Sequence, residues 1–138
     1  MFSHLQASLK QPKMVIYLRI LAIFYGYGAT VHLVNLLDFG ELPWQEMPLS
    51  WKLGDIFYGI IDPLTAVGLW LKTLWGILFF LIAALSQIIL YSGFSNQFAF
   101  TIEQQQTLWS LMIFHLISLG IFGILFWVSV RENQPENN

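Results

Sequence analysis

The sequence contains no cysteine and very little charge. The absence of cysteine excludes disulfides, thiolate metal sites and cysteine nucleophiles. Only 10% of the 138 residues are charged, against roughly 25% in an average soluble protein, whereas 57% are hydrophobic and 17% are aromatic. The formal net charge of −2 gives no reason to expect a nucleic acid partner. This composition predicts an integral membrane protein whose main partner is the lipid bilayer.

Three long stretches lack Asp, Glu, Lys and Arg altogether, namely residues 20–37, 73–102 and 104–130. A membrane-spanning helix needs about 20 apolar residues, so the first and third stretches each fit one span. The middle stretch fits one span followed by a loop, because small polar residues interrupt it at 92–97. We predict a further span at 51–71. The expected fold class is therefore an all-α membrane protein, an up-down bundle of four transmembrane helices.

The predicted spans use most of the chain, so we expect no soluble domain that could hold a separate catalytic core. The sequence contains no recognisable catalytic motif, and we assign no catalytic residue. The expected domain organisation is a polar lead-in at 1–13, a four-helix domain at 14–130 with spans at about 14–37, 51–71, 74–91 and 107–130, and a polar tail at 131–138.

The distribution of basic residues predicts the orientation of the bundle. Lys and Arg near span ends collect on the cytoplasmic side of membranes. All of the Lys and Arg residues except Lys52 lie on the side of the two termini. We therefore expect both termini in the cytoplasm and the loops at 38–50 and 92–106 outside. The six tryptophans lie close to predicted span ends, as in an aromatic belt, and the size and charge bias are typical of the bacterial inner membrane.

The span at 51–71 carries two acids and Pro63. Asp62 falls near its centre, where a carboxylate costs roughly 2.5–3.5 kcal/mol, so we expect this side chain to face inward. Two interpretations remain open for it. Asp62 is either a protonated acid hydrogen-bonded to a backbone carbonyl or to His32, or a proton or cation relay or polar anchor for the head group of a ligand. Asp55 lies nearer the surface and is also typical of an acid at a helix start.

Each predicted span places polar side chains in the half nearer the outer loops, while the other half is almost wholly apolar. Asp55, Tyr58 and Asp62 share one stripe of their helix, because they follow each other at three and four residues. We therefore predict a polar vestibule that opens to the outside, with Asp62 as its floor. The candidate ligand- or proton-binding residues are His32, Asn35, Asp55, Tyr58, Asp62, Gln87 and His115.

Three interpretations of His32 and His115 remain open. Each ring can simply hydrogen-bond a neighbouring helix, as polar groups inside membranes do. The two rings can also be the axial ligands of a b-type haem between the first and fourth helices. With Asp55 or Asp62 they can instead hold a divalent metal, since imidazole and carboxylate suit zinc or iron.

Several features of the chain resemble a known family. Arg19 stands near the start of the first helix, and Gly26 and Gly28 precede polar residues near its outer end. With the up-down arrangement along 14–130, this pattern resembles the DoxX-like small four-helix bacterial membrane proteins. The best-known members are linked to quinone-coupled respiratory enzymes, so the resemblance implies a respiratory context. A fainter similarity to the four-helix sterol-isomerase and sigma-2-receptor group departs from that group in the order of the acids.

The sequence thus leaves three functions open and favours the first, because the chain is small and has no catalytic motif. The first is a non-catalytic accessory subunit of a larger respiratory or photosynthetic membrane assembly, with other membrane proteins or further copies of itself as partners. The second is binding or transport of a small ligand, proton or cation through the vestibule over Asp62. The third is a haem- or metal-binding redox protein that uses His32 and His115.

Overall fold

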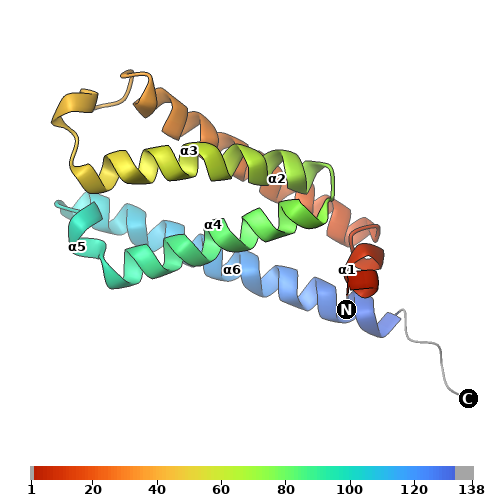
Figure 1. The fold of residues 1–138 in the computed structure, drawn as a ribbon. Helices are drawn as coiled ribbons and strands as arrows, with labels where there is room; N and C mark the ends of the chain where they lie inside the picture. Colours follow the sequence, from red (N-terminus) through yellow and green to blue (C-terminus); the bar gives the residue numbers. More distant parts are fainter. Residues whose placement is uncertain (1, 133–138) are drawn as a thin grey trace, which may run out of the picture.

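The computed structural model describes residues 2–132, and these residues form helices and no strand. The four long helices run alternately up and down (Figure 1). The elements in chain order are α1 (Phe2–Ser8), α2 (Pro12–Leu36), the short 3-10 helix η1 (Trp44–Glu46), α3 (Leu49–Trp70), α4 (Leu74–Gly93), α5 (Ser95–Phe98) and α6 (Ile102–Glu132).

Three of the long helices, α2, α4 and α6, are long and apolar enough to cross a membrane. Their outward faces carry large exposed apolar side chains such as Ile23, Ile89 and Ile124. The helix α3 falls outside this set, since Asp55 and Asp62 lower its hydropathy. The all-α prediction is confirmed and three helices compatible with a membrane are present, whereas a fourth span in α3 remains a prediction.

Local sequence features set the helix ends. Pro12 opens α2, a position where the missing N–H of proline has no cost. The turn between α3 and α4 places Lys72 at a φ of 56°, and the side chain of Thr73 then accepts a hydrogen bond from the backbone N–H of Gly76 at 3.2 Å. The turn between α3 and α4 has only three residues. Pro63 lies inside α3, and the helix continues through it to Trp70.

The structure differs from the sequence prediction at both ends of the bundle. A short helix, α1, occupies the lead-in where none is predicted. The last helix begins at Ile102 rather than at 107, because Thr101 and Gln104 cap it reciprocally. The Thr101 hydroxyl accepts from the Gln104 N–H at 3.2 Å, and the Gln104 side-chain oxygen accepts from the Thr101 N–H at 3.1 Å. The predicted polar tail beyond Glu132 lies outside the described residues.

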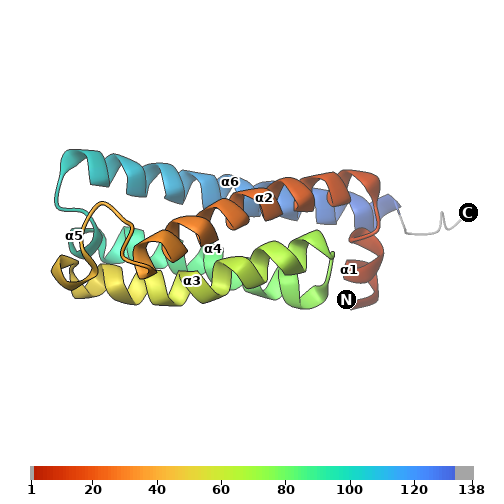
Figure 2. The same ribbon diagram turned by 90° about the horizontal axis from the view of Figure 1, so that it is seen from above.

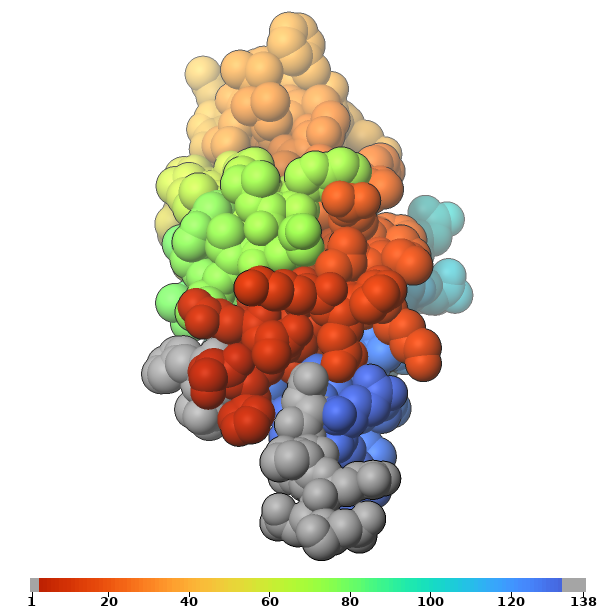
Figure 3. Space-filling model, turned by 90° about the vertical axis from the view of Figure 1, so that its right-hand side faces the viewer, coloured from red at the N-terminus to blue at the C-terminus, as the bar shows by residue number. Residues whose placement is uncertain are grey.

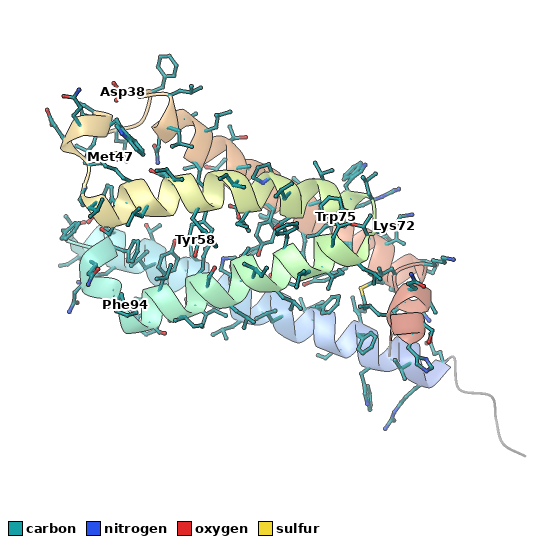
Figure 4. The ribbon with its side chains drawn as sticks, in the orientation of Figure 1. Asp38, Met47, Tyr58, Lys72, Trp75 and Phe94 are labelled. Carbon is teal, nitrogen blue, oxygen red and sulfur yellow. The ribbon has the colours of Figure 1, made fainter. Side chains whose placement is uncertain are left out.

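We call the end of the bundle that carries α1 the terminal end, and the end that carries η1 and α5 the loop end. Figure 3 faces the terminal end and shows α1 and the start of α2 between the turn joining α3 to α4 and the last turns of α6. The Ser129 hydroxyl donates to the Ser8 hydroxyl at 2.6 Å in this contact. In Figure 4, Lys72 and Trp75 mark the terminal end, and Asp38, Met47 and Phe94 mark the loop end.

The terminal half of the bundle holds an apolar core. Leu18, Phe80 and Ala83 have no exposed surface there. Gly68 and Gly76 let the backbones of α3 and α4 approach closely, because a side chain on either glycine would overlap the other helix. The remaining members of the core are Leu9, Met14, Leu21, Ala22, Tyr25, Leu69, Ile77 and Ala84.

The loop half is more open, since α2 diverges from α6 toward the loop end (Figures 1 and 2). The helix α2 packs mainly on α3 along its length and meets α6 mainly near the terminal end and the middle. The polar layer predicted from the sequence lies in this open half.

Candidate functional site

The structure brings polar side chains from all four long helices into the interior of the loop half. Asp62 is only 3% exposed, so the prediction that it faces inward is confirmed. Asp55 on the same helix, Gln87 on α4 and His115 on α6 are also buried. These side chains form two hydrogen-bonded groups, one around Asp55 and one around His115.

The first group surrounds Asp55. The Nδ1 atom of His32 lies 2.7 Å from Asp55 Oδ1, and the amide nitrogen of Asn35 donates to both carboxylate oxygens at 3.2 Å. The ring of Tyr58 stacks against the His32 ring, with 5.7 Å between their centroids. His32 and Asn35 are three residues apart on α2 and so share the face that meets α3. This arrangement fixes the orientation of the His32 ring.

Asp62 lies farther from the loop end than Asp55 on α3. His32 Nε2 is 3.6 Å from Asp62 Oδ2, so the imidazole lies between the two acids. The other oxygen, Oδ1, is buried and has no hydrogen-bond partner among the described residues. Gly28 on α2 allows this approach, because a Cβ atom there would lie 2.8 Å from Asp62 Oδ2. Asp62 therefore keeps one acceptor unused inside the bundle, where an unpaired polar group is costly.

The second group surrounds His115. Its Nε2 atom lies 2.7 Å from the side-chain oxygen of Gln87, and its Nδ1 atom lies 3.3 Å from the Tyr25 hydroxyl. The amide oxygen of Gln87 only accepts, so Nε2 of His115 donates to it. Nδ1 has the Tyr25 hydroxyl as its partner, so each ring nitrogen of His115 has a hydrogen-bond partner. This matches the interpretation in which the histidine joins neighbouring helices.

Tyr58 binds α4 and lies in the interior of the bundle (Figure 4). Its hydroxyl lies 3.0 Å from that of Ser86, and Ser86 in turn donates to the carbonyl of Ala83 at 3.1 Å. Tyr58 therefore donates to Ser86. Its hydroxyl is used in packing α3 on α4, while its ring positions His32.

A cavity of about 830 Å³, which we call the lateral cavity, lies between α2 and α6 over Asp62. Its floor is polar and includes His32, Asp62, Gln87 and His115, and its wall is largely aromatic and aliphatic. The wall and rim consist of Phe24, Tyr25, Tyr27, Gly28, Val31, Tyr91, Glu103, Gln106, Thr107, Ser110, Leu111 and Phe114.

A second cavity of about 680 Å³, the loop-end cavity, lies beneath the loop that contains η1. Asn35 and Asp55 line its inner side, and Glu41 and Met47 line the loop side. His32 lines both cavities. Neither lining includes a Lys or Arg among the described residues, so both cavities have an acidic character.

The haem and metal interpretations can be compared with this geometry. Both histidines line the lateral cavity, but both nitrogens of His115 and Nδ1 of His32 already have hydrogen-bond partners. An axial haem ligand needs a free ring nitrogen aimed at the iron. Within residues 2–132, no three His, Cys, Asp or Glu side chains group as a metal site would require. The structure therefore does not support a metal held by both histidines together with Asp55 or Asp62.

Tyr91 and Glu103 are among the cavity-lining residues that the sequence did not single out. Tyr91 and Glu103 line both cavities at the rim. Tyr91 follows Gln87 by four residues, and this spacing places both on one face of α4. Glu103 gave no comparable signal, because its position depends on where α6 begins.

Together these features define an all-helical protein with membrane-compatible helices around a buried polar cluster and two adjoining cavities. The chain belongs to DUF6163, a family of unknown function, which matches residues 13–133. The match extends from α2 through α6 and includes every residue of both hydrogen-bonded groups. No curated protein and no solved structure matches the chain.

Proposed function

We propose that this protein binds a small amphipathic molecule in the lateral cavity, with a hydroxyl or amine of that molecule donating to Asp62. The observation that carries the proposal is Asp62, which lines the lateral cavity and whose buried Oδ1 atom has no hydrogen-bond partner among the described residues. A buried unpaired acceptor costs roughly 1–3 kcal/mol, and a ligand donor would recover that free energy.

The size and lining of the lateral cavity support a ligand with an apolar body. Its volume of about 830 Å³ falls within the roughly 300–1,000 Å³ of small-molecule sites. Phe24, Leu111 and Phe114 form the wall above the polar floor. An apolar chain or ring system would pack on that wall, while its single polar group reaches Asp62.

The ligand would enter from the bilayer, between α2 and α6. The side chains of Tyr27 and Phe24 at the cavity wall are 72% and 53% exposed, so the cavity reaches the outer surface of the bundle. The neighbouring surface carries Ile20 and Ile23, also exposed and apolar. A molecule dissolved in lipid would therefore reach Asp62 without crossing water.

A photoactivatable long-chain alcohol with a diazirine on its chain tests this function in lipid nanodiscs. We expect labelling of residues 24–31 and 107–114 above that of 74–82, a segment whose exposed side chains report background labelling from lipid. The matched probe lacking the hydroxyl should label all three segments alike. Asp62→Leu should reduce labelling of the cavity to background. Thr65→Val should not, because Thr65 is buried on the same helix but does not line the cavity. Equal labelling of all segments by the alcohol would refute the proposal.

The proposal includes four membrane spans, with α3 as the fourth, and both termini in the cytoplasm of a bacterial cell. The basic residues of the terminal end support this orientation. Because the chain has no cysteine, Glu46→Cys and Lys10→Cys each introduce one reactive thiol. A membrane-impermeant maleimide should label residue 46 on intact cells and residue 10 only after permeabilisation. The reverse pattern would invert the orientation.

The accessory-subunit function and membership of the DoxX-like group remain predictions from the sequence. They rest on chain size, composition and architecture and on no contact described in the structure. They imply that partner polypeptides accompany the chain after mild detergent extraction. A solitary, monodisperse particle would count against the accessory function but would leave the ligand site untouched.

A further inference from the structure

We infer that His32 carries protons between Asp62 and the loop-end cavity, so that occupation of the lateral cavity is linked to proton release at the loop end. The link to a ligand rests on the proposed function, whereas the proton path rests on the geometry of His32 alone. Asp62 would hold the proton when the lateral cavity is empty and lose it when a donor occupies Oδ1.

The position of His32 between two acids is the basis of this inference. Its Nε2 atom faces Asp62 Oδ2 at 3.6 Å on the lateral-cavity side, and its Nδ1 atom faces Asp55 Oδ1 at 2.7 Å on the loop-end side. Histidine is the side chain whose ordinary titration range lies between pH 5 and 8. The ring thus connects the deepest acid with the cavity nearest the loops.

The transfer involves no species other than a proton. The transfer requires the 3.6 Å between Asp62 Oδ2 and His32 Nε2 to close to hydrogen-bond distance. The O–H bond at Asp62 Oδ2 then breaks as an N–H bond forms at His32 Nε2, which gives an imidazolium beside two carboxylates. The imidazolium then loses its Nδ1 proton to Asp55 Oδ1, and Asp55 passes that proton to water in the loop-end cavity. The net change is one proton moved from Asp62 to the aqueous phase and the ring proton of His32 shifted from Nδ1 to Nε2. Uptake retraces the same steps and restores the first tautomer.

Asp55 and Asn35 also orient the His32 ring. The Asn35 amide donates to both Asp55 oxygens, and Asp55 in turn holds the imidazole at Nδ1. A carboxylate at one ring nitrogen fixes the orientation of the other. Asn35 is therefore a positioning residue that keeps Nε2 directed at Asp62.

Other groups near Asp62 do not offer an equivalent path. His115 has a partner on each nitrogen, and the hydroxyls of Tyr25 and Tyr58 are bonded to His115 and Ser86. Toward the terminal end the interior is the apolar core. The titratable groups around Asp62 are Tyr25 and His32 from α2, Asp55 and Tyr58 from α3, Tyr91 from α4, and Glu103 and His115 from α6.

Time-resolved infrared spectroscopy of the unliganded protein in lipid films tests the path without any ligand. On a change from H₂O to D₂O, the protonated carboxyl of Asp62 should shift as O–H becomes O–D. The Asp62→Asn variant, in which this band is lost, assigns it. We expect the exchange to be about tenfold slower or more in His32→Gln and in Asp55→Asn, as for loss of a proton-transfer group. Thr65→Val, the control at a buried residue of the same helix that lines neither cavity, should exchange at the wild-type rate.

Two results would overturn the inference. One is an unchanged exchange rate in both His32→Gln and Asp55→Asn, which would show that protons reach Asp62 by another route. The other is the absence of any protonated Asp62 band across the accessible pH range, since Asp62 would then have no proton to exchange. Either result leaves the photolabelling test of ligand binding intact, so failure of the proton path and failure of ligand binding can be told apart.

Discussion

The close approach of Gly28 to Asp62 gives a sharp test of the packing at the site. Gly26 and Gly28 both lie inside α2, two residues apart, but their surroundings differ. A Cβ atom at position 28 would lie 2.8 Å from Asp62 Oδ2, whereas one at position 26 would meet nothing within 4 Å. Replacement of either glycine by alanine should stabilise the helix by the same amount through its higher helix propensity, about 1 kcal/mol in a helix interior.

The difference between the two variants therefore isolates the contact with Asp62. Overpacking a filled site typically costs about 1–3 kcal/mol, because neighbours must move from their preferred positions. Since the gain in helix propensity cancels, we expect Gly28→Ala to have a free energy of unfolding about 1–3 kcal/mol lower than Gly26→Ala. The displaced carboxylate would also move relative to His32 Nε2, so the infrared band of Asp62 should shift only in Gly28→Ala.

Reversible unfolding in mixed micelles, followed by circular dichroism during titration with sodium dodecyl sulfate, measures these free energies. Combining Gly28→Ala with Asp62→Ala removes the oxygen that the new methyl group meets. We expect the double variant to recover most of the excess cost, a coupling of roughly 0.5–3 kcal/mol as for residues in contact. Equal stability of the two single variants, or no coupling in the double variant, would show that α2 and α3 do not meet as described.

Two further predictions concern contacts outside this pair. Gly76→Ala would place a methyl group against the backbone of Gly68, so it should lower the free energy of unfolding by about 1–3 kcal/mol. Gly120→Ala, the control in open space on α6, should not lower it. Equal free energies of unfolding for the two variants in the same titration would contradict the close approach of α3 and α4. Gln87→Leu removes the acceptor 2.7 Å from His115 Nε2 and should lower the free energy of unfolding by about 1–3 kcal/mol. Nitrogen NMR of His115 in this variant should show a changed tautomer equilibrium. An unchanged spectrum would mean that the ring has another partner.

Much of the fold follows from hydrophobic run lengths. The charge-free stretches predict α2, α4 and α6, because a segment in lipid must hydrogen-bond its own backbone polar groups and so forms a helix. The predicted and observed ends of these helices agree within a few residues in most cases. The start of α6 was placed too late, since reciprocal capping by Thr101 and Gln104 outweighs the polar composition of that segment. The helix α1 was missed because its contacts with the rest of the bundle are tertiary, such as Ser8 with Ser129.

The site was only partly accessible to sequence reasoning. Helical spacing places Asp55, Tyr58 and Asp62 on one face, and the cost of a buried acid predicts that this face turns inward. Spacing alone does not tell which histidine each acid meets. The structure pairs His32 with both acids and gives His115 to Gln87 and Tyr25, because that choice depends on the relative rotation and height of separate helices.

The difference between the two histidines bears on why Asp62 is present at all. In the group around His115, each ring nitrogen has a hydrogen-bond partner. Apolar residues of similar volume often pack as well as such a buried polar group. The pair of His32 and Asp62 is open, with 3.6 Å between ring and carboxylate and one oxygen unpaired. Packing alone gives no reason to keep an unsatisfied acid at this depth, because leucine there would remove the cost. At this buried acid beside a cavity, the proposed ligand or proton would supply the partner that the protein does not.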